Sequence, residues 1–558
     1  MIKSIEIKQY RKLKDLNLKF TPGLNAVSGS NGTCKTSLLH LVGNSFRAVT
    51  KKCTWVNDDK CLQIIKAVNS VTNPKVESLT RGDKQYNDPA HGVPGILFTV
   101  NYFDREPLGF RRHNSLVATR FAVKPMYKKG SGDKLPCCPV VYLGLSRLVP
   151  FGEFQNDSAI AGIKKSLPIQ YQQEINDLYK SFTHYSISYT ATQQMGDLKT
   201  RAEFSSDKEG IDSNTISAGE DNLYVILAAL VSLKYYFESI TSTKTVESIL
   251  LVDEIDATLH PAFQIKLLKL LRDYSAKYKI QVIFTTHSMS TLEDMLDKKD
   301  NVVYLIDNIT SAFLMEDPDI YKIKMHLSSL TNEDIYRDKV IPIFTEDDEA
   351  RFLLNAMLDY FEATKGDEFI GVRRFFHIVK VNLGADSLTD IFQDSKLLRT
   401  TMSSICVLDG DHNSDTGNCI MTLPGKNAGS SGSRKPPEEL LFEYADMLYE
   451  ADDSFWTDRT IISKGYGKTF YLERIKEPRD QYDQQYRDAE AAGTSVPKKR
   501  RVFNKDLFNK ELAFFGLLFK HWLHNPVNKP EIQRFYSQLK TLFQKTAQYN
   551  EISPTEWK

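Results

Sequence analysis

The pattern of apolar and polar residues predicts an α/β region near the N-terminus. Residues 2–8 and 17–20 alternate between apolar and polar, which is typical of strands with one buried face. Residues 24–27 then lead into a glycine-rich loop and an apolar helix over residues 37–46. Strand, glycine loop and helix in this order form the opening unit of an α/β nucleotide-binding domain.

Two later runs, residues 249–252 and 281–284, are apolar without alternation, which is the pattern of parallel strands buried on both faces. Residues 222–240 before them and residues 261–274 between them repeat apolar positions at helical spacing. Residues 50–135 mix short apolar runs with polar turns, and we expect them to form an inserted lobe.

A second α/β rhythm begins near residue 338. Strands are expected at 340–344, 375–381 and 404–408, with helices at 350–361 and 387–392. From residue 503 onward the pattern is helical. We therefore expect an ATPase-type α/β domain, a smaller α/β domain and a mainly helical C-terminal region. Their expected bounds are 1–330, 338–450 and 451–558.

Composition excludes some classes of protein. The 558 residues are 41% apolar and 26% charged, as in soluble globular proteins. Lysine plus arginine (72) balances aspartate plus glutamate (71), which excludes a histone-like nucleic-acid binder but leaves room for a local basic groove. We expect no membrane span and no signal peptide. The thinly spread cysteines (seven in all) favour reduced thiols and a cytoplasmic location.

The loop over residues 29–36 has the spacing of a phosphate-binding loop, except that Cys34 stands where a second glycine is expected. Its backbone N–H groups would surround phosphate oxygens at a helix N-terminus. Lys35 would reach the β- and γ-phosphates of ATP, and the Thr36 hydroxyl would bind Mg²⁺. The candidate nucleotide-binding residues of the loop are Gly29, Asn31, Gly32, Cys34, Lys35 and Thr36.

Three further features have the chemistry of an ATP site. Asp253 and Glu254 end an apolar strand, so Asp253 could bind the metal and Glu254 could activate a water; surface acids capping a strand are the alternative. Ser217 and Gly219 lie in a turn before a long apolar helix, which suits phosphate, although most such turns only cap helices. His287 follows a strand and could sense the γ-phosphate, or it could be a structural histidine.

Taken in order, these four features resemble the ABC-type ATPase family, in its branch of SMC-like and RecF-like heads. The resemblance covers about the first 315 residues. It implies a head-to-tail homodimer, or a higher homo-oligomer, in which Ser217 and Gly219 of one subunit close on ATP held by Lys35 of the other. It also implies that His287 is the switch histidine and that Arg11 lies near the nucleotide.

The second α/β region has acids at two strand ends. Glu346 follows the first strand, and Asp409 and Asp411 follow a later one. If these strands are parallel neighbours, the three carboxylates converge and need a cation between them. Oxygen ligands suit Mg²⁺ or Mn²⁺, which can activate water for phosphodiester cleavage. Each acidic run also has an ordinary interpretation, as a helix start or a turn.

This second pattern resembles a TOPRIM domain, and joined to an ABC-type head it resembles the overcoming-lysogenization-defect (OLD) nuclease family, which includes the Gabija nuclease and retron-associated effectors. The sequence departs from the family at Asp347, where glycine is usual, and at Ala350, where an acid is usual; Glu349 could supply that metal ligand instead. The resemblance implies an ATP- and Mg²⁺-dependent DNA endonuclease of prokaryotic anti-phage defence. For a retron-associated member it also implies a reverse transcriptase with its small DNA or RNA as partner.

Two alternatives stay open. The chain could be an ATP-dependent sensor or scaffold with a degenerate, non-cleaving TOPRIM domain, or a primase-like or topology-changing enzyme, although we find no tyrosine nucleophile or polymerase motif. The basic residue expected near the scissile phosphate could come from one loop or its surroundings. We interpret the basic cluster at 497–502 as a solvated loop, with a phosphate-contacting edge as the alternative. The candidates for the basic residue are Lys426, Arg434, Lys435 and Lys464.

Overall fold

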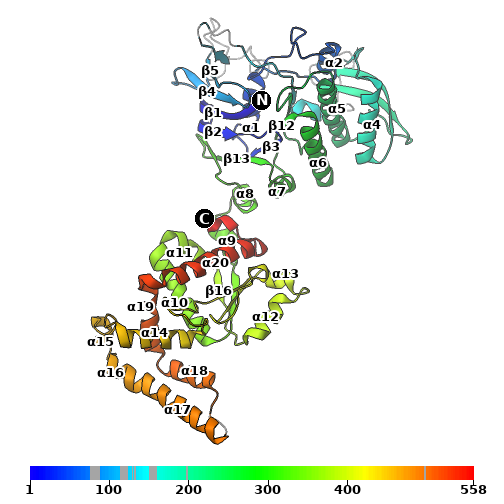
Figure 1. The fold of residues 1–558 in the computed structure, drawn as a ribbon. Helices are drawn as coiled ribbons and strands as arrows, with labels where there is room; N and C mark the ends of the chain where they lie inside the picture. Colours follow the sequence, from blue (N-terminus) through cyan, green and yellow to red (C-terminus); the bar gives the residue numbers. More distant parts are fainter. Residues whose placement is uncertain are drawn as a thin grey trace. The chain divides into compact units, whose positions relative to one another are not determined.

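The computed structural model divides the chain into two compact units, Met1–Ser329 and Leu330–Lys558. It describes residues 1–75, 88–112, 123–128, 130, 134–149, 160–196, 199–494 and 498–557. Figure 1 shows the helices and strands of each unit. In this described part of the chain, no helix combines the length and apolar character that crossing a membrane requires.

The first unit is built on one eleven-stranded sheet, in the order β6-β5-β4-β1-β2-β14-β13-β3-β12-β11-β7. Its central strands pair in parallel and are almost fully buried, because helices cover them and leave no face for polar residues. These strands are β3 (Leu24–Gly29), β7 (Val140–Leu143), β11 (Ser248–Val252), β12 (Ile280–Thr285) and β13 (Asn301–Asp307). The buried parallel strands predicted at 249–252 and 281–284 are therefore confirmed.

The remaining strands extend this sheet mostly in antiparallel pairing. They are β1 (Ile2–Tyr10), β2 (Leu13–Lys19), β4 (Ile96–Tyr102), β5 (Leu108–Arg112), β6 (Val123–Met126) and β14 (Ala312–Leu314). The prediction that 50–135 forms an inserted lobe is wrong for β4, β5 and β6. These strands continue the main sheet from β1, because the apolar positions of β1 and β4 face one shared core.

Helices pack on this sheet and against a small second sheet. The helices are α1 (Lys35–Asn44), α2 (Lys60–Val68), α4 (Ile169–Thr183), α5 (Ala218–Glu238), α6 (Pro261–Tyr278), α7 (Met289–Asp297) and α8 (Ile320–Ser328). The second sheet has the order β10-β9-β8 and consists of β8 (Ile160–Ile163), β9 (Ile187–Met195) and β10 (Lys199–Ser206). Helix α5 is apolar on nearly all sides, and α4 and α6 lie next to it in Figure 1.

The second unit has a four-stranded, wholly parallel sheet in the order β16-β15-β17-β18. Its strands are β15 (Ile341–Thr345), β16 (Phe376–Ile378), β17 (Ile405–Leu408) and β18 (Ile420–Thr422). The strand predicted over 375–381 is shorter than expected, and β18 was not predicted.

Helices surround this sheet and complete the unit. They are α9 (Asn332–Tyr336), α10 (Asp348–Lys365), α11 (Asp367–Arg373), α12 (Ala385–Gln393), α13 (Leu398–Thr401), α14 (Pro437–Ala451), α15 (Arg459–Ser463), α16 (Lys468–Tyr471), α17 (Glu477–Ala492), α18 (Arg500–Lys510), α19 (Leu512–His524) and α20 (Lys529–Ala547). The C-terminal region is helical, as predicted. It is not a separate domain, because Trp522 and Phe535 share one apolar core with Ile343 and Val407 of the sheet.

Candidate active sites

The phosphate-binding loop connects β3 to α1, and its backbone explains its glycines. Gly29, with φ of 143°, lies so close to β13 that a Cβ there would be 2.2 Å from the Leu305 carbonyl oxygen. Cys34 has φ of 67°, in the left-handed region that favours glycine. Glycine would adopt this backbone conformation without strain, whereas Cys34 is strained at the N-cap of α1.

Lys35 is nearly buried at this helix start. Its ammonium donates hydrogen bonds to the carbonyl oxygens of Gly29, at 2.9 Å, and Ser30, at 3.0 Å. Burial lowers the pKa of Lys35, while the nearby charges of Glu254 and Asp253 act in the opposite direction. The cation is thus held by the loop itself, beside two carboxylates and at the helix end that attracts phosphate.

Asp253 joins the loop to the end of β11. Thr36 Oγ1 donates a hydrogen bond to Asp253 Oδ2 at 2.9 Å, and Thr285 Oγ1 donates one to Asp253 Oδ1 at 2.7 Å. A hydroxyl from the loop and a buried carboxylate from the neighbouring strand are the pair that holds Mg²⁺ in phosphate-loop ATPases. The residues present therefore fit a magnesium–nucleotide complex.

Glu254 and His287 follow the C-terminal ends of the neighbouring parallel strands β11 and β12. Glu254 has φ of 49°, and its N–H donates a 2.6 Å hydrogen bond to Thr285 Oγ1. Burial and, next, the charge of Lys35 lower the pKa of His287, while the charges of Asp256, Glu254 and Asp253 act in the opposite direction. The backbone N–H of His287 donates to Asp256 Oδ2 at 3.4 Å. The structure thus brings Lys35, Asp253, Glu254 and His287 within electrostatic reach of one another.

The turn before α5 makes contacts within its own chain. Ser217 caps the helix, because it accepts a hydrogen bond from the N–H of Glu220 while the Glu220 carboxylate accepts one from the N–H of Ser217. A Cβ on Gly219 would lie 2.5 Å from the Thr258 carbonyl oxygen, so glycine is needed for close approach to the loop after Glu254. The capping interpretation of this turn is therefore confirmed, and its role toward a partner subunit stays a prediction.

Arg11 lies at the first turn of α1. Its guanidinium donates a 2.8 Å hydrogen bond to Ser37 Oγ. This contact places a cation beside the phosphate-binding loop, as the resemblance implied.

In the second unit, Glu346 and Asp409 meet at the C-terminal edge of two neighbouring parallel strands. Thr345 of β15 is in register with Val407 of β17, so the next residues of both strands lie together. Glu346 Oε1 accepts a 2.8 Å hydrogen bond from the Asp409 N–H. Asp409 is 1% exposed, and neither of its carboxylate oxygens has a hydrogen-bond partner. Burial and then the charge of Glu346 raise the pKa of Asp409 to about 9.

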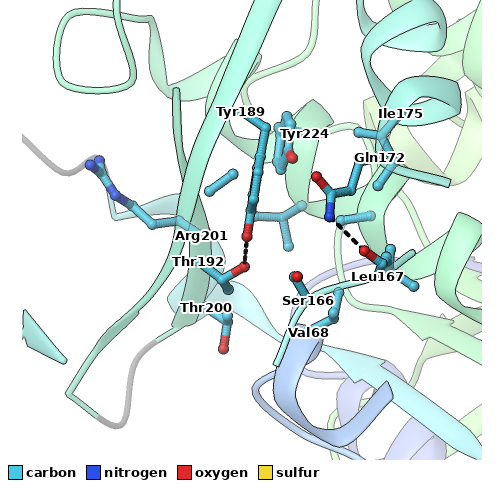
Figure 2. Close-up of a pocket in the computed structure, with 13 residues that line it drawn as sticks. Val68, Ser166, Leu167, Gln172, Ile175, Tyr189, Thr192, Thr200, Arg201 and Tyr224 are labelled. Carbon is cyan, nitrogen blue, oxygen red and sulfur yellow. Dashed lines mark hydrogen bonds between the residues drawn. The ribbon is translucent and has the colours of Figure 1, made fainter. Parts of the chain in front are cut away.

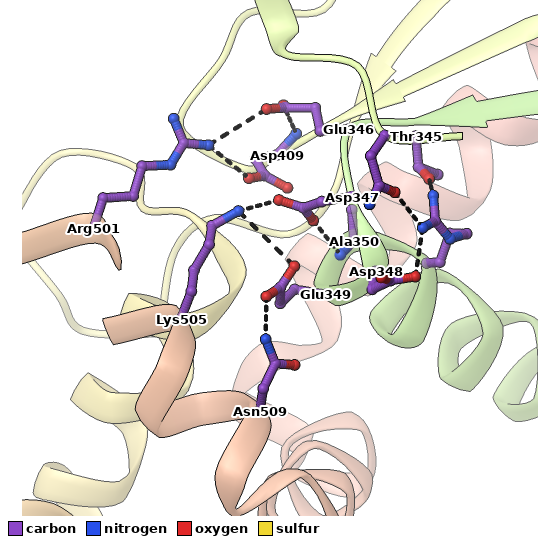
Figure 3. Close-up of polar contacts among 12 residues, drawn as sticks. Thr345, Glu346, Asp347, Asp348, Glu349, Ala350, Asp409, Arg501, Lys505 and Asn509 are labelled. Carbon is purple, nitrogen blue, oxygen red and sulfur yellow. Dashed lines mark hydrogen bonds and ion pairs between the residues drawn. The ribbon is translucent and has the colours of Figure 1, made fainter. Parts of the chain in front are cut away.

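Arg501 of α18 faces this carboxylate pair (Figure 3). Its guanidinium lies 3.6 Å from Glu346 Oε2 and 3.7 Å from Asp409 Oδ2. The interpretation of the 497–502 cluster as a solvated loop is therefore wrong for this residue. Arg501 is the second residue of α18 (Arg500–Lys510), and its side chain points toward the acids.

A second set of charges flanks the first. Asp347 caps α10 by accepting a 3.0 Å hydrogen bond from Ala350 N–H, and its carboxylate pairs with Lys505 of α18. Glu349 is buried, lies 3.9 Å from the Lys505 ammonium and accepts a 2.5 Å hydrogen bond from Asn509. Figure 3 shows these groups converging from α10 and α18. Glu349 therefore faces the site, although it is one residue earlier than the family pattern.

Asp411 takes a more peripheral position than predicted. Its side chain is 36% exposed, and His412 Nε2 lies 3.8 Å from Asp411 and 3.6 Å from Glu346. Within the described ranges, no three His, Cys, Asp or Glu side chains are arranged to hold a metal ion. The buried pair of Glu346 and Asp409, with both Asp409 oxygens unpartnered, fits one Mg²⁺, since this ion usually keeps several water ligands.

The glycine between the two aspartates is explained by packing. A Cβ on Gly410 would lie 2.4 Å from the Cα of Gly425, so the two loops touch backbone to backbone. Arg434 supports this contact by donating a 2.8 Å hydrogen bond to the Gly410 carbonyl oxygen, and it also pairs with Glu531. Arg434 is thus a structural residue of the loop.

Of the other predicted cations, Lys435 pairs with Glu443 at 2.8 Å. No contact brings Lys426 or Lys464 to the acids among the interactions described for these ranges. Arg501 and Lys505 are the cations that contact the carboxylates in the described ranges; the sequence analysis included Arg501 only in the 497–502 cluster, with a phosphate-contacting edge as the alternative, and did not propose Lys505. The basic cluster itself was the signal that could have found Arg501.

Glu438 is a further residue that the sequence analysis missed. It lies in the first turn of α14, it is buried, and its Oε2 has no hydrogen-bond partner. Burial is the main reason that the pKa of Glu438 is raised to about 7. The charge of Asp347 also raises this pKa, whereas the charges of Lys505 and Arg501 lower it. An acid in a first helical turn is common, so the sequence offered no specific signal for it.

A small cavity in the first unit is separate from these sites. Tyr189, Thr192 and Gln172 line it, together with residues of α5 (Figure 2). It leaves about 40 Å³ for water-sized occupants, which is far less than a nucleotide needs. Its location and size exclude it as the ATP site.

Comparisons with known proteins agree with the ATPase features. Residues 152–293 match the protein family described as "AAA domain, putative AbiEii toxin, Type IV TA system". The chain is 23% identical over 350 residues to the Septu protein PtuA of Bacillus thuringiensis, an alignment that covers 58% of this chain and 78% of that protein.

Among solved structures, the chain is similar to the SMC head domain from Thermotoga maritima, at 12% identity, with a TM-score of 0.30 and coverage of 56% of this chain and 99% of that one. It is also similar to the ATP form of the recombination mediator protein RecF, at 13% identity, with a TM-score of 0.32 and coverage of 56% and 99%. The first unit has an α/β fold, and the phosphate-loop spacing, the contact between Thr36 and Asp253 and the match over residues 152–293 are the features that it has in common with ATPase domains.

Proposed function

We propose that this protein is an ABC-type ATPase of prokaryotic anti-phage defence whose second unit is a Mg²⁺-dependent DNA endonuclease of the OLD type, active in the cytoplasm. The hydrogen bond from Thr36 to Asp253 is the observation that supports the ATPase. The defence role rests on the likeness to the Septu protein PtuA and on the resemblance to the OLD family.

In the ATPase unit, Lys35 would leave the loop carbonyls and contact the β- and γ-phosphates of ATP. Thr36 and Asp253 would hold Mg²⁺, which supplies charge neutralisation when bound. Glu254 would orient and deprotonate the attacking water, and His287 would donate a hydrogen bond to the γ-phosphate. Two heads would share each ATP, because the hydrogen bonds described for Ser217 stay within its own turn and the phosphate-binding loop of a partner subunit would supply the nucleotide.

In the nuclease unit, Glu346 and Asp409 would hold the metal ion, which supplies water activation when bound. Glu349 and Asp411 would contribute from the flanks of the site. The guanidinium of Arg501 would move from the two carboxylates to a phosphate oxygen of DNA, where it would neutralise the negative charge of the phosphate. The buried, unpartnered Asp409 carboxylate beside Glu346 is the observation that supports this part of the proposal.

The alternative function is an ATP-dependent sensor or scaffold whose second unit binds without cleaving. The absence of a ready three-ligand metal site in the described residues favours it. Arg501 and Lys505 also supply the cationic charge that a metal would bring to Glu346, Asp409 and Asp347. A retron-type partner, a reverse transcriptase with its small DNA or RNA, is compatible with either function.

Cleavage of plasmid and single-stranded DNA by the full chain, with Mg²⁺ or Mn²⁺, separates the two functions. Asp409→Ala should abolish cleavage and leave ATP hydrolysis intact. Asp390→Asn is a matched control, because Asp390 is exposed on α12. If Asp409→Ala cuts as well as the wild type, the nuclease site lies elsewhere. If the wild type does not cut DNA even when its partner proteins are present, the result supports the sensor or scaffold function instead.

A further inference from the structure

Arg147 is a buried cation in the ATPase unit whose role is not explained by nucleotide contacts. It lies in the short 3₁₀ helix η1 (Leu145–Leu148) that follows β7, and it is 2% exposed. Its three guanidinium nitrogens all donate hydrogen bonds. Nη1 donates to the carbonyl oxygens of Leu143 and Gly144 at 3.3 and 3.0 Å, which anchors the side chain to its own turn. A buried guanidinium with a hydrogen bond from each of its three nitrogens is restricted to a narrow range of orientations.

The other two nitrogens of Arg147 reach separate elements. Nη2 donates a 2.8 Å hydrogen bond to the carbonyl oxygen of Glu254. Glu254 has a left-handed backbone, which is unfavourable for a residue with a side chain, and its N–H is already bonded to Thr285. Arg147 and Thr285 therefore hold the two peptide groups of Glu254 from both sides. They fix the direction in which the carboxylate of Glu254 leaves the backbone.

The third nitrogen, Nε, connects Arg147 to α5. It donates a 2.8 Å hydrogen bond to Asn222 Oδ1, and Asn222 Nδ2 in turn donates a 3.0 Å hydrogen bond to the carbonyl oxygen of Ala257. Asn222 is fully buried and lies three residues after Gly219, in the first turns of the helix that Ser217 caps. The start of α5 is thus tied both to Arg147 and to the loop after Glu254.

A buried ion pair strengthens this connection. Lys199 of β10 pairs with Asp221, the residue before Asn222, and both side chains are almost fully buried. The Lys199 ammonium also donates a hydrogen bond to the carbonyl oxygen of Arg147 at 3.2 Å. Arg147 is therefore held by α5 at its side chain and, through Lys199, at its backbone. A shift of α5 would move the group that holds Glu254.

We propose that Arg147 is a positioning residue that couples the place of α5 to the orientation of Glu254. When the ATP of a partner subunit binds the turn at Ser217, the resulting movement of α5 would pass through Asn222 and Arg147 to Glu254 of the same chain. Each subunit would then hydrolyse its own ATP only after its other face has received the partner's nucleotide. The inference rests on the proposed ATPase activity and on the head-to-tail closure of two subunits. It adds the residues, Asn222 and Arg147, through which the place of α5 would act on Glu254.

The chemistry of the side chain makes the inference testable with a conservative change. Arginine presents several donors in a rigid fork, whereas lysine presents one ammonium that cannot reach the four acceptors of Arg147 together. Arg147→Lys should leave the dissociation constant for ATP unchanged and lower kcat by at least about tenfold, since small errors in the placement of a catalytic group have effects of this size. The readouts are binding of a fluorescent ATP analogue and release of phosphate by the full chain.

Arg201→Lys is the matched control. Arg201 is also a buried arginine of the first unit, and the hydrogen bonds described for it go to Gln193, Ser213 and Asn214, none of which belongs to the loop of Glu254. We expect Arg201→Lys to lower the melting temperature about as much as Arg147→Lys while keeping kcat within about twofold of the wild type. Equal kcat losses in the two variants would overturn the inference, because a general packing defect would then explain both.

A double-mutant cycle tests the path to α5. Asn222→Ala should lower kcat, and adding it to Arg147→Lys should have little further effect, because both changes break the same connection. Independent, multiplying effects would overturn the inference. If Arg147→Lys does not fold, Asn222→Ala alone decides: a kcat equal to that of the wild type refutes the coupling. A wild type without ATP hydrolysis would instead refute the proposed ATPase, which is a separate failure.

Discussion

Replacing Asp409 by asparagine should stabilise the metal-free protein. Asparagine has nearly the same shape as aspartate but cannot ionise. In the wild type, neither carboxylate oxygen of Asp409 has a hydrogen-bond partner in the buried site. The pKa of Asp409 is raised from 3.8 to about 9, chiefly by burial. A raised carboxyl pKa means that the ionised form of Asp409 is less stable in the folded state than in the unfolded state. The resulting loss of folding free energy is absent below pH 3.8, grows as the pH rises toward about 9 and is constant above that.

The magnitude follows from this shift. One pKa unit corresponds to about 1.4 kcal/mol, so the penalty at pH 7 is on the order of 4 kcal/mol, and at pH 5 about 2 kcal/mol. Asp409→Asn should therefore increase the free energy of unfolding of the second unit by up to about 4 kcal/mol at pH 7, or roughly 10 °C in melting temperature. Its advantage over the wild type should shrink by about half at pH 5.

Tryptophan fluorescence during thermal unfolding in EDTA is a suitable assay, because three of the four tryptophans, Trp456, Trp522 and Trp557, are buried in the second unit. Asp411→Asn is the control, since its side chain is 36% exposed, and it should change the melting temperature little. Mn²⁺ should raise the melting temperature of the wild type and not that of Asp409→Asn. The reasoning would be refuted if Asp409→Asn were no more stable than the wild type at pH 7. It would also be refuted if the gain in stability over the wild type were the same at pH 5 and pH 7.

Three other predictions concern the ATPase unit. Cys34→Gly should raise the free energy of unfolding by about 1 kcal/mol in urea titrations, because it removes a side chain from a left-handed position; a loss of stability would contradict the strain. Lys35→Ala should weaken ATP binding, and Glu254→Gln should bind ATP but release phosphate slowly; normal turnover in both would remove the assigned site. Ser217→Arg should bind ATP and fail to close heads in crosslinking with ATP, and unchanged closure would count against the shared site.

The parts of the fold that could be predicted are those with a local signal. The strands at 249–252 and 281–284 have apolar residues at every position except Gln281, a pattern that is typical of a sheet covered on both faces. The meeting of Glu346 with Asp409 also followed from the sequence, because acids at the ends of neighbouring parallel strands share one edge. By contrast, the place of β4, β5 and β6 in the main sheet depends on the pairing of β4 with β1, which no local pattern encodes.

The cations of the second site could not be predicted for a similar reason. Arg501 and Lys505 come from a helix about ninety residues after Asp409, and the face that the helix presents is decided by tertiary packing. Glu438 looks like an ordinary acid at a helix start until its burial is known. The roles of the candidate residues in catalysis stay predictions until the variants above are measured.

The strand order of the first unit has a consequence for how the chain reaches its native state. The central strand β3 forms its parallel ladders only with strands from much later in the chain, so that Val27 pairs with Thr285 on one side and Val303 on the other. Long-range parallel pairing is slow, since loop closure precedes the stabilising contacts. At roughly 5–20 residues per second, a ribosome needs on the order of tens of seconds to supply these partners. During that time the apolar β3 has no ladder, and we expect the nascent chain to depend on chaperones that cover it.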